Sequence, residues 1–169
     1  MPVLTQAPAH SLIARRLAGA DFSDAWCIET TDTGGSALGL FIESLSATPR
    51  WVERCLALRN RMATVAGLKD LGALSAIDPG RDASAYRPGD RVGIFTLIHN
   101  SRDEVLLGDQ DKHLDVTLSV HRRSVADGRV LVTVTTVVHV HNGLGRLYMV
   151  VVKPLHRRIA PAVLRALAE

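Results

Sequence analysis

Two long stretches of alternating residues, 113–122 and 129–141, constrain the fold more than any other feature of the sequence. In both of them the even positions are mostly apolar, and the odd positions carry most of the polar side chains. A period of two is typical of a β-strand with one buried face and one solvated face. The stretches therefore predict two strands of an antiparallel sheet that is covered on one side.

The link Ala126-Asp127-Gly128 determines how these two strands would pair. A two-residue turn at Asp127-Gly128 would set even positions opposite odd ones, and each apolar face would then lie against a polar one. A three-residue loop with Gly128 in the left-handed region restores the match. The predicted opposed pairs are His121 with Thr133, Ser119 with Thr135, Asp115 with His139, and His113 with His141.

This register gathers His113, His139, His141 and Asp115 on the polar face, where opposed Cβ atoms lie about 4.5–5.5 Å apart. Three interpretations remain open. The residues form a solvated face with an Asp115–His139 ion pair, or they take part in acid/base catalysis or substrate contact, or they hold a metal ion. The solvated face is the simplest of the three, and we expect neither a metal nor a cofactor.

Helical patterns precede the predicted sheet. Ser36 is a suitable N-cap for a helix over 37–45, and Thr48 and Pro49 suit the start of a longer helix that Gly67 would end. Apolar residues recur at helical spacing in the longer helix and predict its buried face. They are Trp51, Cys55, Leu58, Met62 and Val65.

The other elements are shorter. Strands are predicted over 24–31, 91–99 and 104–108, and residues 69–90 read as a loop that can cover a pocket. The chain is expected to form a single domain, 1–169, in which residues 1–22 are a packed N-terminal arm.

The C-terminal segment carries two conflicting signals. Asn142-Gly143 is a common hairpin dipeptide and "RLYMVVV" is rich in strand formers, whereas "PLHRRIAPAVLRALAE" has helical spacing. The favoured interpretation is a long helix from about Leu144, bent at Pro154 and Pro161. A further strand over 144–152, followed by a shorter helix, remains the alternative.

Composition excludes several classes of protein. A formal net charge of +3 and an aromatic content of 4% do not favour nucleic-acid binding. Two isolated cysteines, Cys27 and Cys55, do not form a disulfide framework and are expected to be reduced, buried thiols. We expect a cytoplasmic protein without signal peptide or transmembrane segment; the basic C-terminal segment leaves a weak contact with an anionic membrane surface open.

Four segments between Pro49 and Ile159 resemble an uncharacterised bacterial family, domain of unknown function 2867. They are "PRWVERCLALRNRMATVAGL", "RVGIFTLI", "DKHLDVTLSVHR" and "VTVTTVVHVHNGLGRLYMVVVKPLHRRI". The most specific part is His141-Asn142 followed by Leu144-Gly145-Arg146 and Tyr148. The resemblance supports a strand-to-helix corner here, in which Asn142 caps the helix and Gly143 takes a special backbone shape.

The order of elements more distantly resembles the START and Bet v 1 helix-grip superfamily, which includes polyketide cyclase-like proteins. This resemblance implies an α+β fold in which a curved antiparallel sheet wraps a long C-terminal helix and leaves an apolar cavity. The predicted function is a binding module for a small hydrophobic molecule such as a lipid or polyketide-like compound. Candidate wall residues are Trp51, Met62, Leu118, Val120, Val132, Val134, Tyr148, Met149 and Leu155.

Two alternatives come from other classes of protein. One is an enzyme of cyclase, dehydratase or hydrolase type that uses His141, His139 and Asp115 for proton transfer, with His113 nearby. It requires these side chains to face a cavity. The other is a structural protein whose valine-rich sheet forms a homodimer.

Overall fold

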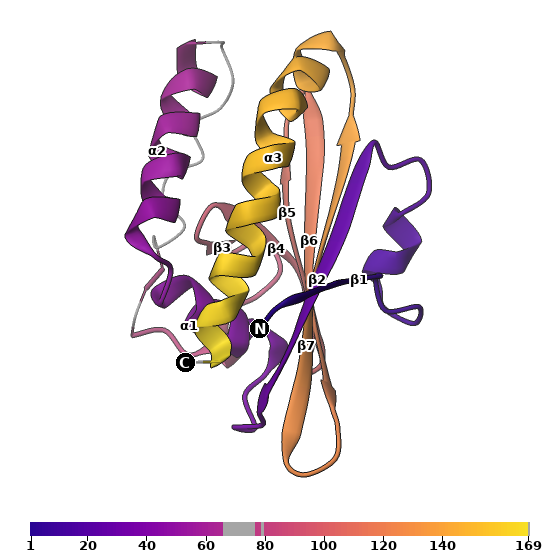
Figure 1. Cartoon of the computed structure of the whole chain (residues 1–169), viewed down its shortest axis with the longest axis vertical. Helices are drawn as coiled ribbons and strands as arrows, with labels where there is room; N and C mark the ends of the chain where they lie inside the picture. Colours follow the sequence, from indigo (N-terminus) through magenta and orange to yellow (C-terminus); the bar gives the residue numbers. More distant parts are fainter. Residues whose placement is uncertain (66–76, 79, 169) are drawn as a thin grey trace.

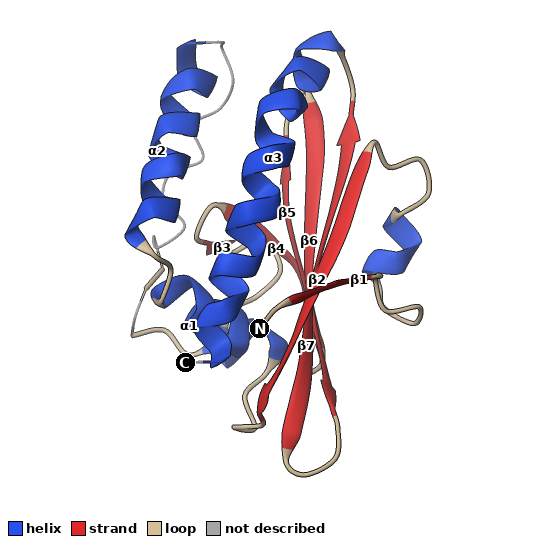
Figure 2. Cartoon of the chain, in the orientation of Figure 1, coloured by secondary structure: helices blue, strands red, loops and turns tan. Residues whose placement is uncertain are grey.

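The computed structural model describes residues 1–65, 77–78 and 80–168. Seven antiparallel strands form one curved sheet in the order β1-β2-β7-β6-β5-β4-β3. Helices α1, α2 and α3 lie on one side of this sheet, and the N-terminal segment lies on the other (Figure 1). Figure 2 shows the same layers by type of secondary structure. A curved antiparallel sheet against a long C-terminal helix is the helix-grip fold, as predicted.

The bounds of the elements are as follows. The strands are β1 Val3–Thr5, β2 Phe22–Thr31, β3 Arg91–Val92, β4 Phe95–Asn100, β5 Glu104–Gln110, β6 Leu114–Ser124 and β7 Arg129–Val140. The helices are α1 Ala37–Ser46, α2 Arg50–Val65 and α3 Gly143–Arg165, with 3-10 turns at Ile13–Arg16, Ala83–Ala85 and Ala166–Ala168.

The predicted register of β6 and β7 is confirmed. Asp115 pairs with His139, Ser119 with Thr135, and His121 with Thr133. Beyond the strand ends, the amide of His141 donates to the carbonyl of His113 at 2.8 Å. In the loop, Gly128 has the expected left-handed backbone (φ 64°) and Asp127 shares it (φ 59°).

The even positions of β6 and β7 form the inner face of the sheet, which lies against the helices. Val120 and Val132 on this face are at most 1% exposed and pack with Leu38 and Leu45 of α1 and with Leu164 of α3. Burial of such side chains is the main stabilising term, about 1.5–3 kcal/mol for each. The sequence pattern therefore identified the core face correctly.

The outer face, made by the odd positions, is less exposed than the alternation suggested. Ser119 and Thr135 on this face are 0% and 1% exposed. The N-terminal segment covers them, because Ile13 packs against Leu106 and Val137 from the outer side. The expectation of a sheet covered on one side is therefore wrong: a period-two pattern shows which face is more apolar and not whether another segment covers the polar one.

The conflict over the C-terminal segment is resolved in favour of the helix. Helix α3 starts directly after β7 and continues through Pro154 and Pro161 to Arg165, so that 144–152 contains no further strand. Asn142 caps α3 by accepting a hydrogen bond from the Gly145 amide at 3.1 Å. Gly143 does not take a left-handed backbone shape, so that part of the prediction is wrong.

The predicted buried face of α2 is rotated relative to the observed one. Val52 is fully buried, whereas Trp51 and Leu58 are 43% and 60% exposed. Both stripes have helical spacing, and only the position of the neighbouring elements selects between them. The side chains of Met62 and Val65, and Gly67, lie outside the described residues. Thr48 does not act as the predicted cap; its hydroxyl donates to the Ser44 carbonyl of α1 at 3.3 Å.

The outermost strands of the sheet were not fully predicted. Strand β1 pairs with β2 through only three residues, which is too short for a recognisable pattern. The predicted strand over 91–99 is divided into β3 and β4, because Gly93 has a left-handed backbone (φ 58°). A chain reversal of this kind is available to glycine at little cost.

A buried arginine at the end of β6 leads to a prediction about acid stability. Arg122 is 2% exposed, and its Nη2 lies 2.7 Å from Asp32 Oδ2. The Gly34 amide holds the pKa of Asp32 below its ordinary value of 3.8, and Ser124 and Arg122 lower this pKa further. The unfolded chain therefore binds a proton at Asp32 more readily than the folded protein does. The contribution of ionised Asp32 to the free energy of unfolding is complete above the pKa of the unfolded state, and it is lost as the pH falls through the lowered pKa of the folded state.

We therefore expect Asp32→Asn to lower the unfolding temperature at neutral pH and to show less additional loss on acidification than the wild type. The difference between the two proteins should shrink as the pH falls below about 4. Thermal unfolding followed by circular dichroism between neutral and acidic pH measures this difference. A difference that is constant over the whole range would contradict the assigned role of Asp32.

Candidate functional site

A cavity of about 200 Å³ lies between the inner face of the sheet and the helices, and it is partly open to the surface. The sheet contributes Leu114, Val116, Leu118, Val120, Val134 and Val138 to its wall. Helix α3 lies opposite and contributes Tyr148, Met149, Val152, Leu155, His156 and Ile159. A mostly apolar wall with few polar groups is typical of small-molecule sites.

The structure places six of the nine predicted wall residues at this cavity: Leu118, Val120, Val134, Tyr148, Met149 and Leu155. Trp51 is a correction, because its side chain is 43% exposed and does not line the cavity. Val132 is a second correction, since it is 0% exposed within the solid core and does not line the cavity. Met62 lies in α2, but its side chain is outside the described residues.

Several wall residues were not predicted. Phe22, Phe41 and Phe95 come from β2, α1 and β4, and Cys55 and Leu56 come from α2. Alternation along β2 could have indicated Phe22, which shares the inner face with Trp26. The helical stripe of α2 had indicated Cys55 as a buried-face residue, although not as a wall residue. No local signal indicates Phe41, Phe95 or Leu56.

The C-terminal helix also brings a histidine and an aspartate together at the cavity. His156 lines the wall, and its Nε2 lies 3.0 Å from Asp24 Oδ1 of β2. The side chains of His156 and Asp24 are 22% and 8% exposed. Asp24 Oδ2 accepts a second hydrogen bond from Trp26 Nε1 at 3.2 Å. The ring of Phe22 meets His156 edge to face, with 5.7 Å between the ring centroids.

The predicted polar patch lies apart from the cavity, since none of His113, Asp115, His139 and His141 is in its wall. The ion pair also differs from the prediction. Asp115 Oδ1 lies 3.1 Å from Nε2 of the diagonal neighbour His141, whereas His139 Nε2 lies 3.3 Å from the Ala18 carbonyl. A diagonal pair on one face of a sheet is within reach of long side chains.

His113 has a structural role, because it contacts the residue that caps α3. It is 8% exposed, and its Nδ1 lies 3.2 Å from Asn142 Oδ1. The same asparagine donates to the Lys112 carbonyl at 3.0 Å and caps α3. Within the described part of the chain, no three side chains of His, Cys, Asp or Glu are placed to hold a metal ion.

A family model described as "Protein of unknown function (DUF2867)" matches residues 16–163. The chain belongs to this DUF2867 family. No curated protein matches the sequence. Within the matched region, the segment from His141 to Tyr148 is the corner at which β7 passes into α3, and its contacts position the helix above the cavity.

Two solved structures of norcoclaurine synthase from Thalictrum flavum are similar to this chain. One, in complex with dopamine and hydroxybenzaldehyde, is 13% identical with a TM-score of 0.38, and covers 95% of this chain and 94% of that one. The other is 14% identical with a TM-score of 0.34, and covers 96% of each chain. The helix-grip assignment rests on the strand order and helices of this chain itself.

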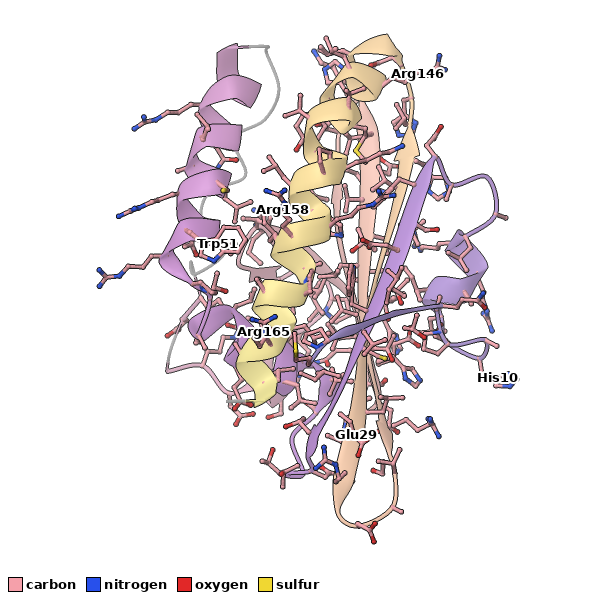
Figure 3. The ribbon with its side chains drawn as sticks, in the orientation of Figure 1. His10, Glu29, Trp51, Arg146, Arg158 and Arg165 are labelled. Atoms are coloured by element: carbon pink, nitrogen blue, oxygen red, sulfur yellow. The ribbon has the colours of Figure 1, made fainter. Side chains whose placement is uncertain are left out.

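The outward side of α3 is both apolar and basic. Leu147 and Val150 are 65% and 70% exposed, and Arg146, Arg158 and Arg165 are exposed on the same helix (Figure 3). None of the helices, over the residues that the structure describes, has the length and hydropathy needed to cross a bilayer. The weak contact with an anionic membrane surface stays a prediction.

Both cysteines are free thiols and are half-buried. Cys55 lines the cavity, whereas Cys27 lies on β2 opposite Val3 and Thr133. Both were expected to be buried, and the structure leaves each of them only half-buried. Cys55 offers a position at which a thiol probe can report on the cavity.

Proposed function

We propose that this protein binds one small hydrophobic molecule in the cavity between the sheet and α3. The observation that supports the proposal is the cavity itself: about 200 Å³ of space with a mostly apolar wall. An empty apolar space between packed elements costs stability, since the side chains around it lose contacts. A bound apolar molecule restores those contacts.

The volume limits the size of the molecule. An apolar cavity of about 150 Å³ accepts benzene, and pockets for drug-sized ligands begin at about 300 Å³. The cavity of this chain therefore suits a single substituted ring or a short acyl chain. Of the ligand classes predicted from the sequence, we favour a small polyketide-like compound or a short-chain lipid, since a larger lipid would have to extend through the open side of the cavity.

The direct experiment is native mass spectrometry of protein purified from its own host, followed by extraction and identification of any bound small molecule. A mass increment that disappears on denaturation is the expected result. A preparation that is ligand-free and that also binds none of a panel of single-ring and short-chain compounds would overturn the proposal.

A cavity-filling variant tests the location. Val134→Phe adds a ring to the wall on β7 and should lower the affinity for a bound ring compound at least about tenfold, because the added side chain occupies the same space. Val151→Phe makes the same change on the exposed side of α3, where Val151 is 45% exposed, and should leave the affinity unchanged. Isothermal titration calorimetry with the ligand found above compares the two variants. An equal loss in both would contradict the location.

The enzyme alternative that uses His141, His139 and Asp115 lacks support, because these residues do not line the cavity. A homodimer and a single domain over 1–169 stay predictions. Light scattering checks the first, and one cooperative unfolding transition is expected for the second.

A further inference from the structure

The pair formed by His156 and Asp24 joins one face of α3 to the edge of the cavity. A bond between a helix and a strand can be purely structural, so the question is what the histidine still offers to a bound molecule. A carboxylate only accepts hydrogen bonds, and therefore Nε2 of His156 carries the proton in its bond to Asp24 Oδ1. In the neutral ring Nδ1 then carries the lone pair.

Among the described residues, none is hydrogen-bonded to His156 Nδ1. Two other polar side chains of the wall have partners: the Ser44 hydroxyl donates to the Phe41 carbonyl at 2.7 Å, and Asp111 Oδ1 accepts from the amides of His113 and Leu114 at 2.6 Å and 3.0 Å. The ring of His156 lines a largely apolar wall, and its Nδ1 is available as a hydrogen-bond acceptor.

Charged groups of both signs lie around His156. Asp24, 92% buried at its side chain, holds a negative charge 3.0 Å from Nε2. Lys153 lies on the same side of α3, with Nζ 5.6 Å from the centroid of the Phe22 ring and 3.4 Å from the Asp21 carbonyl. Among the described residues, the other charged groups of the cavity wall are Asp109 and Asp111, from β5 and the turn after it.

We propose that His156, oriented by Asp24, is the proton acceptor of this cavity, and that the bound molecule is a small ring or chain with one weakly acidic hydroxyl group of the phenol or enol type. In the step, the O–H bond of the ligand breaks and an N–H bond forms at Nδ1. The electron pair stays on the ligand oxygen, and the imidazolium lies between this anion and Asp24. The inference rests on the proposed function, since it needs a molecule in the cavity.

The test uses two probes of nearly equal size, 4-nitrophenol and nitrobenzene, and the complete chain. The phenolate form of 4-nitrophenol absorbs at longer wavelength than the phenol, so its spectrum reports the proton directly. At a pH below the pKa of the free phenol, we expect wild-type protein to raise the phenolate-to-phenol ratio of the bound probe about tenfold or more, because an adjacent opposite charge shifts a pKa by about 1–3 units. Nitrobenzene has no proton to give and serves as a measure of binding alone.

Two variants test whether His156 and Asp24 cause the increase in phenolate. His156→Gln should abolish the increase in phenolate and should cost nitrobenzene, which has no proton to give, less affinity than 4-nitrophenol. Asp24→Asn should reduce the increase, because the neutral amide no longer stabilises the imidazolium. His141→Gln, which changes a histidine outside the cavity, should behave as the wild type. A structural role of the pair alone would lower the affinity for both probes without altering the spectrum.

The outcomes separate the two proposals. If both probes bind and the wild-type spectrum stays that of the phenol, the inference about His156 is overturned and the proposed cavity function stands. If neither probe binds, the proposed function fails for ring-sized molecules and the inference fails with it. If His156→Gln does not fold, the wild type and Asp24→Asn still test the inference. The phenolate signal must be present in the wild type and reduced in Asp24→Asn.

Discussion

Gly145→Ala is expected to destabilise the protein by about 3 kcal/mol or more. A Cβ atom at this position would lie far inside van der Waals contact with the carbonyl oxygen of His113 and 2.9 Å from Cγ1 of Val140. The obstacle is backbone, which cannot rotate away as a side chain could. The first turn of α3 would have to move off the end of β6, and the Asn142 cap would be lost with it.

Gly143→Ala is the matched control, two residues earlier in the same turn. A Cβ atom there meets nothing within 4 Å, and the backbone is not left-handed. Since alanine is the better helix former, we expect no loss and a gain of up to about 1 kcal/mol. Urea unfolding at neutral pH measures both variants. Equal stability of Gly145→Ala and the wild type would show that α3 does not rest on the His113 carbonyl.

Glu104→Ala is expected to destabilise the protein by about 3 kcal/mol and to release the N-terminal segment. The carboxylate is 7% exposed and accepts three hydrogen bonds: from the Leu12 amide at 2.7 Å, from the Ile13 amide at 3.3 Å and from the Ser119 hydroxyl at 2.8 Å. Its removal leaves these donors unpaired in a buried place. The 3-10 turn Ile13–Arg16 loses its anchor on β5.

Trypsin provides the measurement, because Arg15 and Arg16 lie in this turn. Cleavage there should be much faster in Glu104→Ala than in the wild type, and urea unfolding gives the loss of stability. Glu29→Ala is the control, since Glu29 forms an exposed pair with Arg129 and exposed pairs contribute about 0–1 kcal/mol. If cleavage at Arg15 and Arg16 is no faster than in this control, Glu104 does not hold the segment.

The register of β6 and β7 could be predicted because it depends on few local facts. Apolar and polar positions alternate over more than ten residues, and only one loop length lets the two apolar faces coincide. Burial of one face makes a shift by a single residue very costly, since every side chain would change sides. The same reasoning placed Leu118, Val120 and Val134 on the side of the cavity.

The face of α2 could not be predicted in this way. Trp51 and Leu58 continue a stripe with helical spacing, and so does the set that begins with the buried Val52. Helical periodicity shows that a helix has an apolar side, but two overlapping stripes are distinguished only by the elements that pack against them. Here the exposed stripe contains the larger side chains, which is why sequence reasoning chose it.

The candidate base was missed for a different reason. His156 and Asp24 are 132 residues apart in the sequence, and neither belongs to a spacing pattern with catalytic meaning. The histidines of β6 and β7 attracted attention because adjacent strands bring them together in an obvious way. Proximity within a sheet can be derived from register, whereas proximity between a helix and a strand depends on how the helix crosses the sheet.

The sequence by itself determined the two long strands β6 and β7, their alternating faces, the loop at Gly128 and, through its family resemblance, the helix-grip class. The tertiary structure alone decided which histidine meets the cavity, which side of α2 is buried and that the N-terminal segment covers the outer face. The physical reason is the range of the interactions. Alternation, capping and turn geometry act between neighbours in the chain, whereas the cavity and its polar groups arise where elements far apart in sequence leave space between them.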